Sequence, residues 1–153
     1  MLKGIDPVLS GELLRILDEM GHGDQLLLVD RNYPAAASGK PVVRLGEIGV
    51  ERAARAILSV FPLDPFLEHP LERMEVDDDP EKVAPVQARL LEIARAQHPE
   101  PLDYGIVPRL SFYERATKVA AVVHTLESEP YGCFILHKGV IFPDANRGEM
   151  SDA

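Results

Sequence analysis

The chain of 153 residues has a formal net charge of −9 at pH 7, and hydrophobic residues make up 46% of it. This length suits one domain with its own core, and the acidity argues against a protein that binds nucleic acid or anionic membranes, because both need clustered lysine and arginine. No apolar stretch reaches the roughly 18 residues of a membrane span, and the N-terminus lacks the pattern of a signal peptide. One cysteine excludes an internal disulfide and fits a reducing compartment, so we expect a cytoplasmic protein.

The first third of the chain predicts a helix followed by two strands. Ser10 is placed to cap a helix with leucines on one face, and Gly21 ends it. Residues 25–29 form a run of leucine and valine without a polar break, which favours a strand buried on both faces. We expect a turn at Asn32-Tyr33-Pro34 and a second short strand at 42–45.

The middle of the chain continues the alternation of helix and strand. Apolar residues at helical spacing predict a second helix over 50–61, closed by Pro62. Three prolines make 62–70 a loop, and 71–76 alternates apolar and polar residues as a half-exposed strand does.

A third helix follows the acidic turn at 77–80 and ends near Gln97. Pro85 lies near its first turn, where proline is tolerated. The predicted apolar stripe of this helix consists of Val83, Val86, Leu90, Leu91 and Ala94.

The last third predicts more strands than helices. It contains a short strand at 106–107, a short helix with Ser111 as its cap, and two strong strands at 119–125 and 133–137. From Asp144 the chain is polar, and we expect a frayed tail.

Alternating strands and helices predict an α/β fold. We expect a single domain over 1–143, built as a three-layer α/β/α sandwich with a mixed, largely parallel central sheet, and a polar C-terminal tail over 144–153.

Common catalytic motifs are missing from the sequence. It has no glycine-rich phosphate loop, no histidine or cysteine pair with metal-ligand spacing and no nucleophile elbow. Cys133 lies in an apolar strand, where an inert small hydrophobe is the expected role. Polar side chains at the ends of predicted strands and helices remain as candidates: His22, Asp24, Asp30, Arg109, Tyr113, Glu114, Arg115 and Tyr131.

The first candidates each have two interpretations. His22 could end a helix, or its position between two glycines could leave its ring open to a ligand. Asp24 suits the closing of a turn. Asp30 could belong to a turn, or bind a ligand at the carboxyl end of a buried strand, where ligands of open α/β sheets collect.

The later candidates also have structural alternatives. Arg109 could form a surface salt bridge, and Tyr113 and Tyr131 could be packing residues. Glu114 and Arg115 have the pattern of a solvated helix face.

Five segments occur in a characteristic combination: L-K-G-I-D-P, E-M-G-H-G-D, V-D-R-N-Y-P-A, R-L-S-F-Y-E-R-A and P-Y-G-C-F-I-L-H-K-G-V. Together they closely resemble the family of L-fucose mutarotase and D-ribose pyranase from residue 1 to about 142. The segments N-Y-P-A and F-Y-E-R-A are similar to the fucose branch rather than the ribose branch.

The resemblance implies an isomerase that interconverts the anomers of a free sugar without a metal or other cofactor. It implies catalytic roles for His22 and Tyr131, and sugar-binding roles for Asp30, Arg109 and Tyr131. The resemblance also implies Tyr113 and Cys133 as substrate-binding positions. Cys133 stands where fucose members often have asparagine, so the change alters specificity if that side chain contacts the sugar and is harmless if only the backbone does.

Mutarotation requires one group to accept the anomeric hydroxyl proton while another donates to the ring oxygen. Histidine suits this work, because its unperturbed pKa of about 6.5 is close to neutral pH. Residues 24–30 would span about 20 Å when extended, which separates His22 from Asp30 within one subunit. The resemblance also implies a homo-oligomeric ring, often a decamer, in which a neighbour could complete each site.

Two other functions stay open at this level. A D-ribose pyranase would interconvert pyranose and furanose forms, and the Phe112–Tyr113 segment is the feature that favours the fucose branch over it. A non-catalytic sugar-binding module could share the same fold, but the joint presence of His22, Asp30, Arg109 and Tyr131 argues against it.

Overall fold

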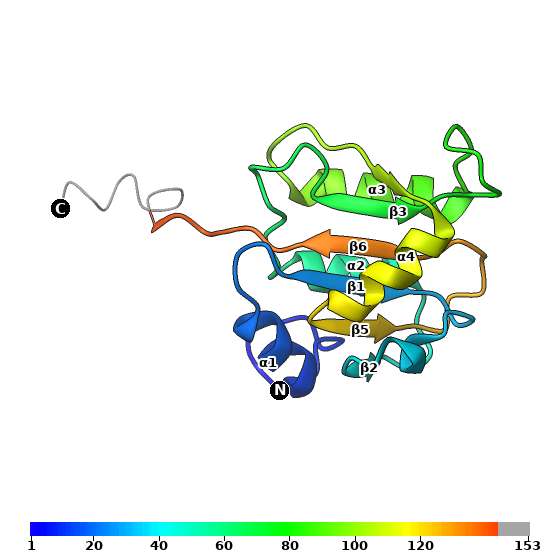
Figure 1. Ribbon diagram of the computed structural model, residues 1–153. Coiled ribbons are helices and arrows are strands. Elements are labelled where there is room, and N and C mark those ends of the chain that lie inside the picture. The colour runs from blue at the N-terminus through cyan, green and yellow to red at the C-terminus, as the bar shows by residue number, and fades with distance from the viewer. Residues whose placement is uncertain (144–153) are drawn as a thin grey trace.

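The computed structural model, which describes residues 1–143, contains a six-stranded sheet between two layers of helices (Figure 1). The predicted polar tail, 144–153, lies outside the described residues. Along the sheet the strand order is β2-β5-β1-β6-β3-β4, and β6 runs antiparallel to both of its neighbours while every other pair is parallel. The expected mixed, largely parallel sheet is therefore confirmed. The strands are β1 Gln25–Val29, β2 Val42–Arg44, β3 Leu71–Met74, β4 Gly105–Val107, β5 Ala121–His124 and β6 Phe134–His137.

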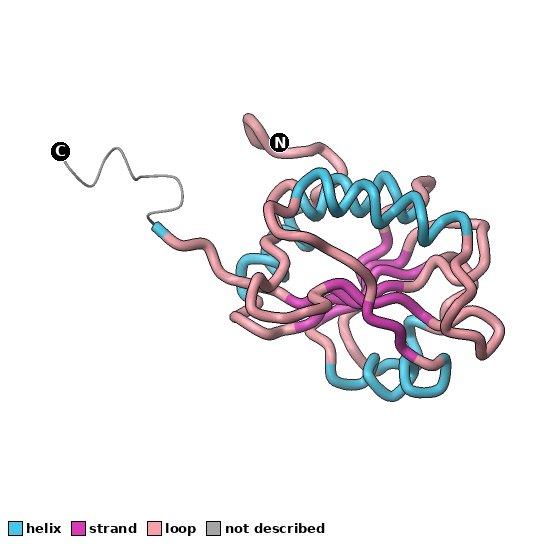
Figure 2. Tube along the Cα trace, turned by 90° about the horizontal axis from the view of Figure 1, so that it is seen from above, coloured by secondary structure: helices cyan, strands magenta, loops and turns pink. Residues whose placement is uncertain are grey.

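The helices divide between the two faces of the sheet, as Figure 2 shows from above. Helices α1, α2 and α3 share one core with the sheet, and α4 packs with the 3-10 turns η1 and η2 on the opposite face. No helix in the described part of the chain is long and apolar enough to cross a membrane. The helical elements are α1 Gly11–Glu19, η1 Ala35–Ser38, α2 Val50–Leu58, α3 Pro85–Gln97, α4 Arg109–Arg115 and η2 Ala116–Lys118.

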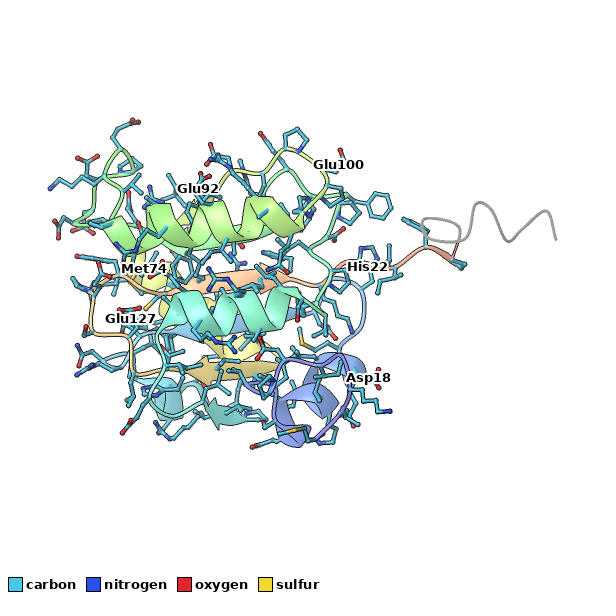
Figure 3. All side chains as sticks on the ribbon, turned by 180° about the vertical axis from the view of Figure 1, so that it is seen from behind. Asp18, His22, Met74, Glu92, Glu100 and Glu127 are labelled. Carbon is cyan, nitrogen blue, oxygen red and sulfur yellow. The ribbon has the colours of Figure 1, made fainter. Side chains whose placement is uncertain are left out.

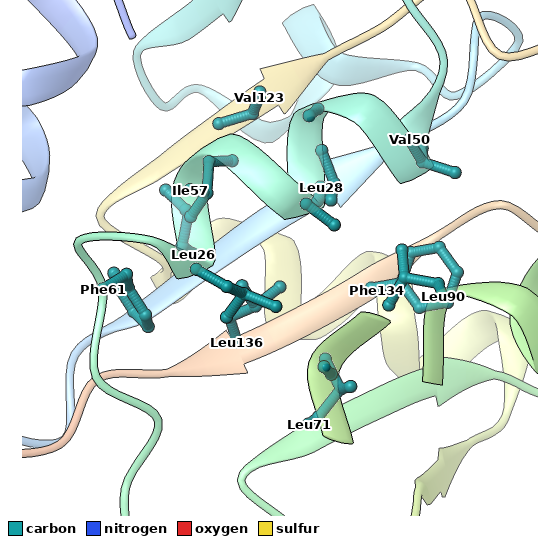
Figure 4. Close-up of a cluster of buried hydrophobic side chains, with 14 of the residues drawn as sticks. Leu26, Leu28, Val50, Ile57, Phe61, Leu71, Leu90, Val123, Phe134 and Leu136 are labelled. Atoms are coloured by element: carbon teal, nitrogen blue, oxygen red, sulfur yellow. The ribbon is translucent and has the colours of Figure 1, made fainter. Parts of the chain in front are cut away.

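Strand β1 is buried on both faces, as its unbroken apolar sequence predicts. Leu26 and Leu28 point into the core under α2 and α3 (Figure 4), and Leu27 and Val29 point into the core under α4. Side chains alternate along a strand, so only an apolar run can fill both cores at once.

Helix α3 begins later than the acidic turn suggests. Pro85 is its first residue, and Val83 lies before it, 53% exposed, rather than on the apolar stripe. The prediction for Val83 was wrong because proline, which lacks a backbone N–H, sets the start of the helix, where that donor is not needed. Gln87 then reaches back and accepts a hydrogen bond from the Ala84 backbone N–H.

Helix α4 was also placed too late in the sequence. It starts at Arg109, with Pro108 in the N-cap position, so Ser111 lies inside the helix and does not cap it. The Pro108 carbonyl accepts a hydrogen bond from the Phe112 N–H, and proline's restricted φ suits this entry into a helix.

A polar cluster that the sequence did not predict fixes α4 to the sheet. Glu72 on β3 accepts hydrogen bonds from Arg115, at 2.6 Å from Nη2, and from His137 Nε2 at the end of β6. Arg115 Nη2 also donates to Gln25 Oε1 at 2.9 Å. The interpretation of Arg115 as a solvated residue was wrong, because only the tertiary fold brings β3 and β6 beneath the end of this helix.

The cluster predicts a loss of stability in acid. Burial raises the pKa of Glu72, but hydrogen bonds from His137 and Arg115 outweigh this effect and lower the pKa to about 2. Its stabilising contribution is therefore complete above about pH 4.5, the ordinary value for glutamate, and is lost as the pH falls toward 2. In urea denaturation, we expect Glu72→Gln to lower the free energy of unfolding by about 2 kcal/mol at pH 7 and by progressively less below pH 4.5. A difference that does not change with pH would contradict this assignment.

Candidate functional site

The predicted site residues form two groups at opposite ends of β1. His22 precedes this strand and Asp30 follows it. Figure 3 shows the separation, with His22 at one end of the molecule and Met74, which lines the Asp30 pocket, at the other. The structure thus agrees with the expectation that His22 and Asp30 do not meet within one subunit.

The loop that carries His22 forms a tight turn and is exposed to solvent. The carboxylate of Asp24 accepts a hydrogen bond from the Gly21 N–H at 2.7 Å, which confirms that Asp24 closes a turn. Gly23 has a φ of +88°, a conformation that favours glycine, and a Cβ added there would have no heavy atom within 4 Å. The space beside Gly23 is therefore open, and the His22 side chain next to it is 47% exposed.

Asp64 holds the imidazole of His22. The Nε2 atom of His22 lies 3.0 Å from Asp64 Oδ2, and Asp64 Oδ1 accepts a hydrogen bond from the Phe66 N–H. The Asp64 side chain is only 5% exposed. A buried carboxylate accepts only, so it selects the imidazole tautomer with its proton on Nε2 and leaves Nδ1 as a proton acceptor.

Sequence reasoning missed Asp64, because it lies in a proline-rich loop 42 residues from its partner. One signal in the sequence could have found it: Asp64 is a carboxylate set between Leu63 and Pro65 in a largely apolar segment. Such a residue is seldom buried unless it has a partner.

The end of β6 supports both members of this pair. The backbone N–H of Asp64 donates to the His137 carbonyl at 3.0 Å, and the N–H of Gly23 donates to the Lys138 carbonyl at 2.8 Å. Gly139 follows and packs against the backbone of Leu63 and Asp64.

A side chain at position 139 should displace Asp64. The Cβ of a Gly139→Ala variant would lie 2.6 Å from the Leu63 carbonyl oxygen and 2.7 Å from Asp64 Cα, so the loop must move. We expect a loss of about 1–3 kcal/mol in the free energy of unfolding, measured by denaturation, together with lower catalytic activity.

Gly11→Ala is the matched control for this variant. Gly11 is the first residue of α1, and a Cβ there meets nothing within 4 Å. Its stability and activity should stay close to those of the parent. Equal behaviour of the two variants would rule out the steric explanation.

The second group surrounds a pocket of about 270 Å³ at the carboxyl end of β1. All five residues predicted to bind substrate line it, from β1, α4 and the segment before β6. The lining consists of Asp30, Asn32, Tyr33, Met74, Arg109, Tyr113, Pro130, Tyr131 and Cys133.

Asp30 is the buried carboxylate of this pocket. Its Oδ1 accepts a hydrogen bond from the Asn32 N–H at 3.0 Å, and its Oδ2 accepts one from the Cys133 thiol at 3.4 Å. Burial raises the pKa of Asp30, while the bonds from Cys133 and from backbone N–H groups act in the opposite direction. Burial also raises the pKa of the Cys133 thiol, which keeps it neutral and able to donate. Cys133 is thus a buried small residue, as expected, and also a hydrogen-bond donor to Asp30.

Tyr131 lies at the rim of the pocket in a left-handed backbone conformation, with a φ of +62°. Its hydroxyl donates to Asp77 Oδ1 at 2.8 Å and accepts from the Asp77 N–H at 3.2 Å. The bond to the Asp77 carboxylate raises the pKa of Tyr131. Gln87 donates to the Tyr131 carbonyl at 3.0 Å and so holds the strained residue in place.

Two tyrosine rings and an arginine form an aromatic wall. The rings of Tyr33 and Tyr113 lie 5.6 Å apart, and the Arg109 guanidinium lies 5.8 Å from the Tyr113 ring centre. Sequence reasoning assigned Tyr33 to a turn only, and its burial beside Asp30 appears only in the folded chain. Apolar rings beside a few polar groups are typical of sugar and other small-molecule pockets.

Within residues 1–143, one group of three carboxylates converges closely enough to ligate a metal: Glu51, Glu127 and Glu129. Arg89 bonds Glu51 and Glu129, and Glu127 accepts a hydrogen bond from the Val50 N–H at the start of α2. These contacts already give the three carboxylates partners, and the group belongs to neither part of the site.

Comparisons with known proteins identify relatives along nearly the whole chain. Residues 3–141 match the model of the RbsD / FucU transport protein family. An L-fucose mutarotase of Glaesserella parasuis serovar 5 (strain SH0165) is 42% identical over 141 residues, which cover 92% of this chain and 96% of that protein. FucU from Bifidobacterium longum has a crystal structure with a TM-score of 0.85 and 38% identity, covering 92% of this chain and all of its own (100%). The fucose mutarotase from Streptococcus pneumoniae in complex with L-fucose has a TM-score of 0.84 and 30% identity, with coverages of 92% and 100%.

Proposed function

Because the chain belongs to the RbsD / FucU family, we propose that it is an L-fucose mutarotase, an isomerase that interconverts the α and β anomers of the free sugar. The observation that carries this proposal is the pairing of His22 with the buried Asp64, which supplies an oriented general base. The pocket around Asp30 supplies a site of suitable size and chemistry for a monosaccharide.

The pocket binds and orients the sugar. Asp30 accepts hydrogen bonds from sugar hydroxyls, and Arg109 donates to their oxygens. Tyr33 and Tyr113 offer the apolar surface on which a sugar ring packs. A position set by several directional bonds brings the anomeric carbon to a fixed place relative to the catalytic groups.

Ring opening then needs two proton transfers. His22 accepts the proton of the anomeric hydroxyl at Nδ1, and Asp64 stabilises the resulting imidazolium. The bond between C1 and the ring oxygen breaks, and C1 and the anomeric oxygen form a carbonyl. Tyr131 donates a proton to the released ring oxygen. In this structure the Tyr131 proton is directed at Asp77, so sugar binding must replace that hydrogen bond. Rotation about the C1–C2 bond and reversal of the transfers yields the other anomer.

The two parts of the site must come from different subunits. His22 and the Asp30 pocket lie at opposite ends of β1, and one chain cannot bring them to the same sugar. We propose a homo-oligomer, a ring and possibly a decamer, in which His22 and Asp64 of one subunit close the pocket of its neighbour. Exposed large apolar side chains near His22 and in the segment after β6 support this arrangement, because exposed apolar patches mark interfaces. These side chains are Phe66, Leu67, Ile141 and Phe142.

Size-exclusion chromatography with light scattering tests the assembly. We expect a particle several times the mass of the 16.9 kDa chain. A stable monomer that retains activity would contradict the shared site.

The buried single cysteine is also consistent with the cytoplasm, which we propose as the compartment.

Saturation-transfer NMR of anomeric protons tests the activity directly, with L-fucose and D-ribose at equilibrium, in the presence and absence of the protein. We expect faster exchange between the α and β anomers of L-fucose. Faster pyranose–furanose exchange of ribose without an effect on fucose would favour the pyranase. Binding of a sugar without faster exchange would indicate a non-catalytic module.

A further inference from the structure

Glu72 contacts the supports of both parts of the site, although it belongs to neither. It lies on β3, and its carboxylate bonds Arg115 from α4 and His137 from β6. Its side chain is 16% exposed. It follows that one largely buried carboxylate holds an arginine and a histidine that come from different structural elements.

The first contact fixes the helix that carries the pocket residues. Helix α4 begins with Arg109 and includes Tyr113, both of which line the pocket, and it ends with Arg115. A helix of seven residues is too short to be stable alone, so its direction depends on its tertiary contacts. Arg115 is bound at that end by Glu72 and Gln25.

The second contact fixes the chain that supports the catalytic pair. His137, held by Glu72 through its ring, offers its carbonyl to the Asp64 N–H at 3.0 Å. The next residue, Lys138, offers its carbonyl to Gly23, the neighbour of His22, at 2.8 Å. Movement at the end of β6 would therefore displace the backbone on both sides of the pair.

We propose that Glu72 is a positioning residue that aligns the sugar-binding helix and the His22–Asp64 pair at the same time. This inference rests on the proposed function. In a ring with shared sites, the carboxylate of one subunit would align parts of two neighbouring active sites.

Kinetic measurements on three variants separate the two contacts. Arg115→Met removes the contacts of α4 to Glu72 and Gln25 but leaves the contact between Glu72 and His137, and we expect it mainly to raise KM for L-fucose. His137→Leu removes only the contact to β6, and we expect it mainly to lower kcat. Glu72→Gln should do both, with kcat/KM about tenfold lower, because small misplacements of reacting groups are costly. The matched control is Glu92→Gln, which breaks an exposed ion pair with Arg95 on α3 and should leave both constants unchanged.

Hydrogen exchange measured by mass spectrometry provides a test that does not require activity. In Glu72→Gln we expect the largest acceleration of exchange at the catalytic pair, in the peptides that contain residues 20–24 and 62–66, and at the sugar-binding helix, residues 109–115. Exchange in α3 should change no more than the lower global stability requires, which shows that the fold is intact. Faster exchange at the catalytic pair alone, at the sugar-binding helix alone, or at neither would overturn the proposal. So would unchanged kcat and KM in an active Glu72→Gln enzyme. An inactive parent protein would refute the proposed function, while the exchange data would still decide the role of Glu72.

Discussion

Replacing His22 with alanine should reduce the catalysed exchange of L-fucose anomers by about 10²–10⁴-fold, the usual contribution of one general acid–base group. The variant loses the imidazole that Asp64 orients, while the open loop at Gly21 and Gly23 tolerates the smaller residue. Saturation-transfer NMR with and without each protein measures the change. Sugar binding, followed by titration of L-fucose, should be weakened far less, because Asp30 and Arg109 remain.

Two further variants sharpen this result. Asp64→Asn should also be strongly impaired, since an amide can donate to Nε2 and stabilise the wrong tautomer of the imidazole. Glu92→Gln serves as the control, because Glu92 lies on the exposed side of α3 and forms an ion pair with Arg95 that touches neither part of the site. Anomer exchange by His22→Ala at the parent rate would remove the support for a catalytic histidine.

Mixing two inactive variants should restore activity if the site is shared. A His22→Ala subunit still has an intact pocket, and an Asp30→Asn subunit still has an intact His22–Asp64 pair. In random mixed rings, a site works when the first type supplies the pocket and the second supplies the pair. At equal amounts this condition holds for about one quarter of the sites, by the statistics of a head-to-tail contact.

Co-expression of the two chains with different affinity tags, followed by tandem purification and NMR, measures this recovery. The control is a mixture of the same two proteins purified separately and not allowed to exchange subunits, which should remain inactive. No recovery in verified mixed oligomers would show that His22 and Asp30 act in the same chain. Purified single variants define the baseline for both comparisons.

The sequence was most informative where a local pattern is sufficient. The apolar run 25–29 predicts a doubly buried strand, and β1 is that strand. The turn closed by Asp24 was also confirmed, and the five residues predicted to bind substrate line one pocket in the structure. The pocket residues come from segments that follow or precede buried strands, and such segments meet at one edge of a sheet.

Two errors concern local helix starts, and a third depends on a distant segment. The predictions for Ser111 and Val83 were wrong because Pro108 and Pro85 set the starts of the two helices, which is a local effect. Arg115 has the sequence pattern of a solvated residue, and its ion pair with Glu72 depends on a strand 43 residues away.

The sequence by itself determined the α/β class, the strand that separates the two polar groups and, by resemblance, the family. By the same resemblance it predicts His22 as the catalytic histidine. Only the tertiary structure decided that Asp64 pairs with His22, that Tyr33 joins the pocket wall and that Glu72 connects α4 to β6. The physical reason is that periodicity and turn chemistry act between neighbours in the chain, whereas a buried carboxylate is defined by its hydrogen-bond partners. Those partners are brought together by the packing of the sheet and cannot be read from spacing along the chain.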